Sequence, residues 1–64
     1  MYGIVSSRKM ENGIVVFWDQ GDERKYESFN YQELVDMKVN MLDLLDRPHA
    51  YHIDPAAHLL VPKK

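Results

Sequence analysis

Five apolar residues in a row, Ile14–Trp18, form the segment that most restricts how this chain can fold. They are rich in β-branched and aromatic side chains, which favour a strand. Val15 and Phe17 point to one face of such a strand, and the other three residues point to the opposite face. A strand in a half-solvated sheet would alternate apolar with polar residues, so both faces need cover. We expect the interior of a small barrel to cover one face, and a helix or another subunit to cover the other.

Turn residues on both sides of this segment indicate two hairpins. Asn12-Gly13 is the commonest two-residue hairpin signal, because both positions tolerate positive φ. The sequence Asp-Gln-Gly-Asp at 19–22 predicts the second turn. The preceding strand is expected to begin at Tyr2 and to continue through Met10, and the following strand spans 24–29. Residues 2–29 therefore predict a three-stranded antiparallel unit.

A helix over 31–46 is the first choice for the next segment. Asn30 followed three residues later by Glu33 is a near match to a capping box, and Pro48 ends the helix. Apolar residues then fall at helical spacing, namely Leu34, Met37, Met41, Leu44 and Leu45.

The same segment has a second interpretation. Apolar and polar residues alternate strictly from Val35 to Met41, which predicts a fourth strand near 34–39. Asn40 would then cap a short helix over 41–46, with Asp43 at its third position. The tail predicts two short extended pieces, 50–53 and 58–61, joined by a turn at Asp54-Pro55.

Length and composition limit the class of protein. A chain of 64 residues predicts one domain, 1–64, and so small a domain often gains stability from a partner, so we expect self-association, most simply as a dimer. The absence of Cys excludes disulfides and thiolate metal sites. The net charge of −2 argues against a general binder of phosphate backbones. No apolar run is long enough to span a membrane and no signal peptide is recognisable, so the protein is expected to be cytoplasmic.

Residues that carry catalytic or metal chemistry are few. His49, His52 and His58 lie close together in the sequence, but their spacing matches no zinc motif, and we interpret them as ordinary surface or strand-end histidines. The acidic residues near the second turn are interpreted as a solvated hairpin end. The chain has no nucleophile-elbow pattern and no glycine-rich phosphate loop. We therefore expect no enzyme activity, no metal and no cofactor.

Aromatic side chains are the better candidates for a functional site. Most of them are expected in the core, because a very small domain uses large side chains to fill itself. Trp18 is the open case, since it lies at a strand end beside an acidic turn. The residues we assign to partner binding are Phe17, Trp18, Tyr26 and Tyr31. The Met and Leu stripe of the expected helix predicts core or a fixed dimer seam, with a docking groove as the alternative.

The order of residues 3–34 resembles the SH3-like small barrels, especially their Tudor and KOW-like branches. The shared pattern is Val-x-Phe-x-Asp-x-Gly, filled by Val15, Phe17, Asp19 and Gly21, followed by Tyr26 and Leu34. The resemblance implies an α+β or mainly β fold, in which a small antiparallel barrel or curled sheet carries one helix and a short C-terminal extended segment. It also implies a binding module rather than an enzyme, without fixing the ligand.

Two functions are compatible with these features. The first is a small non-enzymatic regulatory protein that binds a larger protein as an adaptor or inhibitor, as phage and plasmid proteins often do. The alternative is a nucleic-acid-binding module, in which basic residues meet at one end of the first two hairpins beside the aromatics. These basic residues are Arg8, Lys9, Arg24 and Lys25.

Overall fold

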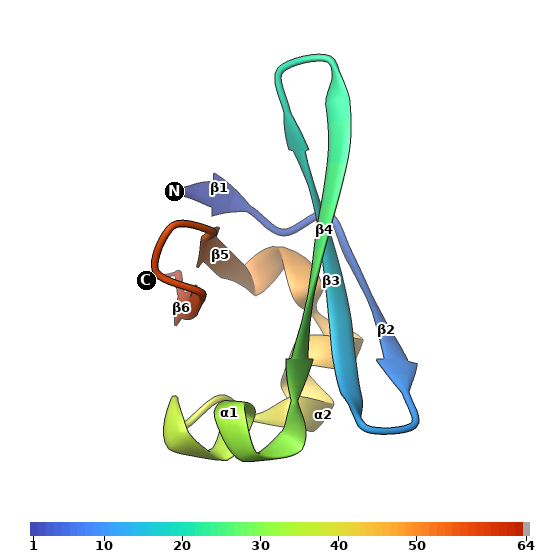
Figure 1. Ribbon diagram of the computed structural model, residues 1–64, viewed down its shortest axis with the longest axis vertical. Coiled ribbons are helices and arrows are strands. Elements are labelled where there is room, and N and C mark those ends of the chain that lie inside the picture. Colours follow the sequence, from blue (N-terminus) through green and yellow to red (C-terminus); the bar gives the residue numbers. More distant parts are fainter. Residues whose placement is uncertain (64) are drawn as a thin grey trace.

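Two open, three-stranded antiparallel sheets and two short helices make up the protein in a computed structural model that describes residues 1–63 (Figure 1). One sheet has the order β2-β3-β4 and the other the order β1-β5-β6. The strands are β1 (Tyr2–Gly3), β2 (Ser6–Met10), β3 (Gly13–Gln20), β4 (Glu23–Asn30), β5 (Tyr51–Asp54) and β6 (Leu59–Pro62). The expectation of a mainly β fold is confirmed in outline, but the sheets do not close into a barrel.

The first predicted strand is in fact two strands that belong to different sheets. The Ile4 amide donates to the carbonyl of Tyr51 in one sheet, and the Val5 amide donates to the carbonyl of Phe17 in the other. The chain therefore crosses between the sheets at Ile4 and Val5. The predicted strand was wrong on this point because a crossing needs no turn residue and leaves no sign in the sequence.

The β3–β4 hairpin is long and projects beyond the rest of the molecule (Figure 1). Its turn contains Gly21 at φ +65°, the left-handed region that glycine enters without a steric cost. The turn between β2 and β3 differs from the prediction. Met10 pairs with Gly13, so the two turn residues are Glu11 and Asn12, and Gly13 is the first residue of β3. Neither Asn12 nor Gly13 has a positive φ.

Two short helices, α1 (Tyr31–Asp36) and α2 (Met41–Asp46), replace the single helix predicted over 31–46. Lys38 adopts a left-handed φ of 60°, and the amide of Val39 donates to the carbonyl of Leu34. The amide of Lys38 also donates to the carbonyl of Val35, and together these two bonds form a Schellman motif that ends α1. The break allows Val39 to join the core, where it is buried.

The second interpretation of this segment was half correct. The Asn40 side chain accepts a hydrogen bond from the amide of Asp43, and it caps α2 as that interpretation expected. The fourth strand near 34–39 is absent, since residues 31–36 are helical. The capping box at the start of α1 is confirmed by reciprocal bonds between Asn30 and Glu33.

The core lies between the two sheets and the helices. Its buried residues come from nearly every element, and they are Ile4, Ile14, Val16, Trp18, Phe29, Leu34, Val39, Leu44, Tyr51, Ile53 and Leu60. The Ser7 hydroxyl donates to the carbonyl of Leu44 at 2.7 Å and ties α2 to β2 on this inner side. Among residues 1–63, no helix is long and apolar enough to cross a membrane.

Asp43 joins α2 to the start of β5. Its carboxylate accepts hydrogen bonds from Arg47 Nε at 2.7 Å and from the Tyr51 hydroxyl at 2.8 Å. These bonds, with the Arg47 bond first, hold the pKa of Asp43 below its usual value of 3.8. Burial, followed by the bond to Asp43, raises the pKa of the Tyr51 hydroxyl, so this hydroxyl stays a donor at neutral pH.

Asp43→Asn is therefore expected to make the protein less sensitive to acid. A carboxylate whose pKa is lowered on folding stabilises the fold above its unfolded-state pKa, and this stabilisation is lost as the pH falls through the folded-state pKa. As the pH falls below about 4, the melting temperature of the wild type should decrease more than that of the variant. Thermal unfolding between pH 2.5 and 6 measures the difference, and parallel curves for the two proteins would contradict the expectation.

Candidate protein-binding face

The outer face of the β2-β3-β4 sheet carries the strongest candidate site. Directly opposed residues in an antiparallel pair point to the same face, so the register assigns each side chain. Val15 and Phe17 point outward, and Phe17 pairs with Tyr26. We define the outer face by its apolar side chains, together with the neighbouring crossing residue, as Val5, Met10, Val15, Phe17 and Tyr26. None of these five side chains belongs to the core cluster or to the described residues that pack against it.

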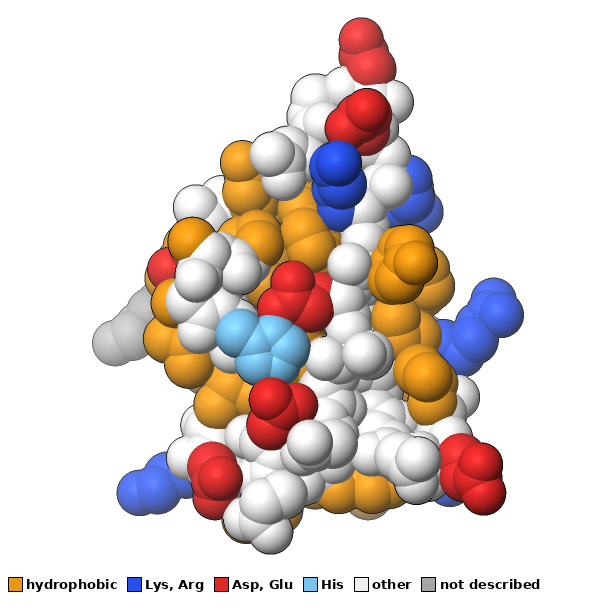
Figure 2. Space-filling model, viewed as in Figure 1, with side chains coloured by type: hydrophobic (Ala, Val, Ile, Leu, Met, Phe, Trp, Pro, Cys, Tyr) orange, Lys and Arg blue, Asp and Glu red, His pale blue; other side chains and the backbone are white. Residues whose placement is uncertain are grey.

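Tyr26 is the most prominent side chain of this face. It is 71% exposed, although a tyrosine ring offers a large apolar area for burial. Its ring lies 6.2 Å from that of Phe17, with a tilt of 48° between them. Phe17 is half-buried, so the Tyr26 ring packs against a partly buried neighbour while most of its own surface faces solvent. Figure 2 shows apolar side chains gathered beside strands β2 to β4, on the side away from β5 and β6.

The rest of the outer face forms an apolar surface around this pair. Val5 and Met10 are each 45% exposed, whereas Val15 in the centre is only 9% exposed. The cross-strand neighbours of Val15 are Arg8 and Ser28. Val15 is therefore buried beside side chains of its own sheet and outside the core cluster, whereas the sequence led us to expect that a helix or another subunit would cover one face of this strand.

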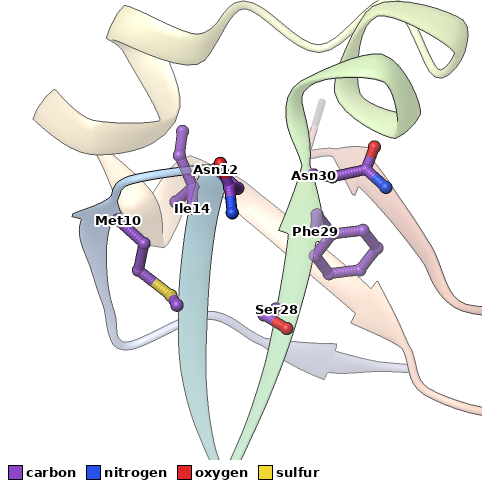
Figure 3. Close-up of a pocket in the computed structure, with 7 residues that line it drawn as sticks. Met10, Asn12, Ile14, Ser28, Phe29 and Asn30 are labelled. Atoms are coloured by element: carbon purple, nitrogen blue, oxygen red, sulfur yellow. The ribbon is translucent and has the colours of Figure 1, made fainter.

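A half-open pocket of about 240 Å³ continues the outer face toward the β2–β3 turn (Figure 3). In the figure, Met10 and Ser28 flank β3 from the two neighbouring strands, whereas Ile14 points toward the helices. Gly13 lines the pocket with backbone atoms alone. The complete lining is Met10, Asn12, Gly13, Ile14, Ser28, Phe29 and Asn30. Its lining combines the flexible side chain of Met10 with polar groups of Ser28 and Asn30.

Charge is unevenly distributed over this face. Arg24 and Asp19 are paired across the hairpin with an Nε–Oδ1 distance of 2.5 Å, so their charges compensate each other. Arg8 points outward beside Val15 and forms no ion pair with any residue in the described range 1–63. The outer face therefore combines an apolar centre with one uncompensated positive charge.

Trp18 lies on the opposite side of β3, in the core. It is 3% exposed, and its ring stacks with that of Tyr2 at 6.4 Å. Its indole nitrogen donates to Gln20 at 3.4 Å. The open question of core or display is answered in favour of core, so Trp18 does not contribute to the outer face.

Tyr31, the fourth predicted binding residue, has an anchoring position. It packs partly against the core, and its hydroxyl donates to the carbonyl of Met10 at 3.2 Å. Its amide also donates to the carbonyl of Asn12. Tyr31 therefore fixes the start of α1 against the β2–β3 turn, beside the pocket rather than on the exposed surface.

The four basic residues of the nucleic-acid alternative do not meet at one end of the hairpins. Arg8 and Lys9 lie opposite Val15 and Ile14, whereas Arg24 and Lys25 lie near the far end of β3. Lys25 pairs with Glu23 at 2.9 Å. The hairpin register thus separates the basic residues into two pairs, and acidic partners compensate one of these pairs.

The three histidines are also separated. His49 belongs to the short 3-10 helix Pro48–Ala50, His52 belongs to β5, and His58 lies in the turn before β6. Within residues 1–63, no cluster of three or more His, Cys, Asp or Glu side chains is arranged to hold a metal ion.

Sequence reasoning found Phe17 and Tyr26 but did not bring them together. A two-residue turn at Gly21 and Asp22 would have predicted their pairing, because turn length fixes the register of a hairpin. Val5 and Met10 were missed because their exposure depends on the sheet crossing and on the first turn. In comparisons with models of protein families, with curated proteins and with solved structures, the chain matches none of them.

Proposed function

We propose that this protein is a small, non-enzymatic binding protein that docks a larger protein onto the outer face of its β2-β3-β4 sheet. The observation that carries the proposal is Tyr26, which is 71% exposed and packs against Phe17 within an apolar surface outside the core. Exposed tyrosines of this kind supply much of the energy of protein interfaces, because they bury a large area with few rotatable bonds.

A partner would add to a fold that is already compact. The accessible surface is 4418 Å², and a folded monomer of 7.6 kDa is expected to expose about 4,300 Å². The chain therefore does not expose an unusual area that only a permanent subunit would cover. This supports binding to a separately folded partner, in keeping with an adaptor or an inhibitor, over an obligate assembly.

The chemistry of the outer face indicates what this partner presents. An apolar side chain would enter the pocket lined by Met10 and Gly13, and a second apolar group would cover Tyr26. Arg8 favours a carboxylate beside these groups, because a charge left unpaired at the edge of an interface loses solvation without compensation. We therefore assign to the partner an apolar segment that carries at least one acidic residue.

Tyr26→Ala is expected to weaken partner binding by at least about 30-fold, because loss of an aromatic hot-spot contact costs about 2 kcal/mol or more. Its melting temperature should stay close to that of the wild type, since the ring lies outside the core. Leu42→Ala is the matched control, because Leu42 is 79% exposed but belongs to α2.

The experiment has two stages. Proteins of the native host captured by the wild type and by both variants are compared by quantitative mass spectrometry, and the purified partner is then titrated by calorimetry. Equal binding of wild type and Tyr26→Ala would contradict the proposal. Self-association through the same face, which the sequence predicted as a dimer, is checked beforehand by light scattering over a range of concentrations. The SH3-like resemblance also stays a prediction.

A further inference from the structure

His58 lies outside the outer face and contacts two carboxylates. It lies in the turn between β5 and β6, and each of its ring nitrogens contacts a different carboxylate. Nδ1 contacts Oε2 of Glu27 on β4, and Nε2 lies 2.9 Å from Oε2 of Glu33 on α1. The ring also stacks on Phe29, with 4.1 Å between ring centres. Figure 2 shows a histidine between two acidic side chains on this side of the molecule.

Both contacts are hydrogen bonds only when the imidazole is protonated. An ionised carboxylate accepts hydrogen bonds and donates none. A neutral imidazole carries a single N–H group, so it can donate to one carboxylate, and its other nitrogen then faces an acceptor. The titratable groups that face His58 from the elements packed against it are Glu27 on β4 and Glu33 on α1, and Phe29 contributes an uncharged ring.

The contact joins three separate parts of the fold. Oε1 of Glu33 accepts a hydrogen bond from the Asn30 amide in the capping box, while its Oε2 contacts His58. The β5–β6 turn is thus connected to the end of β4 and to the start of α1. His58 also has a φ of 54°, a left-handed conformation that is uncommon for residues other than glycine. The turn has two backbone hydrogen bonds of its own, from the amide of Ala57 to the carbonyl of Asp54 and from the amide of His58 to the carbonyl of Pro55, and the two carboxylates add contacts from outside it.

We propose that His58, Glu27 and Glu33 form a proton-dependent clamp that fastens the β5–β6 turn to β4 and α1. The clamp is complete when the ring carries both protons. Loss of one proton removes one hydrogen bond and places a nitrogen lone pair against a carboxylate, and the turn over Pro55–His58 loosens. Only a ring that carries both protons can donate to both carboxylates, so raising the pH opens the clamp.

Glu33→Gln separates the clamp from general effects of pH. The side-chain amide of the introduced glutamine can donate to a neutral ring nitrogen, so both bonds survive when the ring loses a proton. Glutamine also keeps the capping box. We expect the melting temperature of the wild type to be about 4 °C higher at pH 5.5 than at pH 7.5, and this difference to fall below about 1 °C in Glu33→Gln.

His52→Gln is the matched control, since it removes a histidine outside the clamp and should keep the wild-type difference. Nitrogen-15 spectra of the ring give an independent readout, with both His58 nitrogens protonated at pH 5.5. Amide signals of Ala57 and His58 should shift with the ring titration in the wild type. Equal pH dependence in wild type and Glu33→Gln, or a singly protonated ring at pH 5.5, would overturn the proposal.

Discussion

Trp18→Ala is expected to destabilise the protein more than any of the other substitutions proposed. Replacing a buried tryptophan with alanine costs about 3 to 5 kcal/mol, because the large apolar area is lost and a cavity remains. A domain of 64 residues has a total stability of about 3 to 10 kcal/mol, so the substitution removes a large part of it. The melting temperature should fall by more than about 15 °C if the variant folds at all.

Circular dichroism during heating measures this effect without relying on tryptophan fluorescence. Phe17→Ala is the appropriate comparison, because Phe17 is the adjacent residue along the same strand and faces outward. Its effect on stability should be clearly smaller, since its ring is only half-buried. An unchanged melting temperature of Trp18→Ala would mean that the ring does not support the core, and the assignment of the two faces of β3 would have to be reversed.

Gly13→Ala is expected to be the most damaging of the alanine substitutions at the three glycines. A Cβ atom at this position would lie 1.9 Å from the carbonyl oxygen of Phe29, and only 2.8 Å from Cα of Asn30. Both are backbone atoms and cannot rotate away, so β3 and β4 must separate where the capping box begins. We expect a loss of about 1 to 3 kcal/mol in the free energy of unfolding, measured with urea.

Gly3→Ala provides the control for this substitution. Its Cβ would meet the end of the Lys63 side chain at 3.2 Å, and a flexible side chain can move aside at little cost. The free energy of unfolding of Gly3→Ala should therefore stay within about 0.5 kcal/mol of the wild type. Similar values for the two variants would show that the close approach of β3 to β4 at Gly13 is not required.

Local patterns in the sequence predicted the elements that depend on neighbouring residues. The strand from Ile14 to Trp18 was found because its composition and its flanking turns agree, and both helix caps, Asn30 and Asn40, were found because a cap needs only a few residues. The choice between one helix and two could not be made in this way. It depends on whether burying Val39 in the core stabilises the protein more than breaking the helix at Lys38 destabilises it. That balance is set by residues far away in the sequence.

The candidate site was also predictable only in part, because some of its features depend on distant residues. Phe17 and Tyr26 were identified from their residue types, but the face of β3 that lies outside depends on where the helices pack. Nothing in the sequence of this segment shows whether Val15 or Val16 faces the core. Trp18 was left open because it lies at a strand end beside the acidic turn, and the structure places it in the core, on the side of the second sheet and the helices.

The crossing of the chain at Ile4 and Val5 has a consequence for the order of folding. Strands β2, β3 and β4 follow one another in the chain and are joined by two-residue turns, so their pairing closes only short loops. By contrast, Tyr2 pairs with Ile53, which requires nearly the whole chain to be present. Closing so long a loop costs more entropy than closing a hairpin. The three-stranded meander is thus expected to form first, and the N-terminal strand docks last, joining the two sheets in the final step.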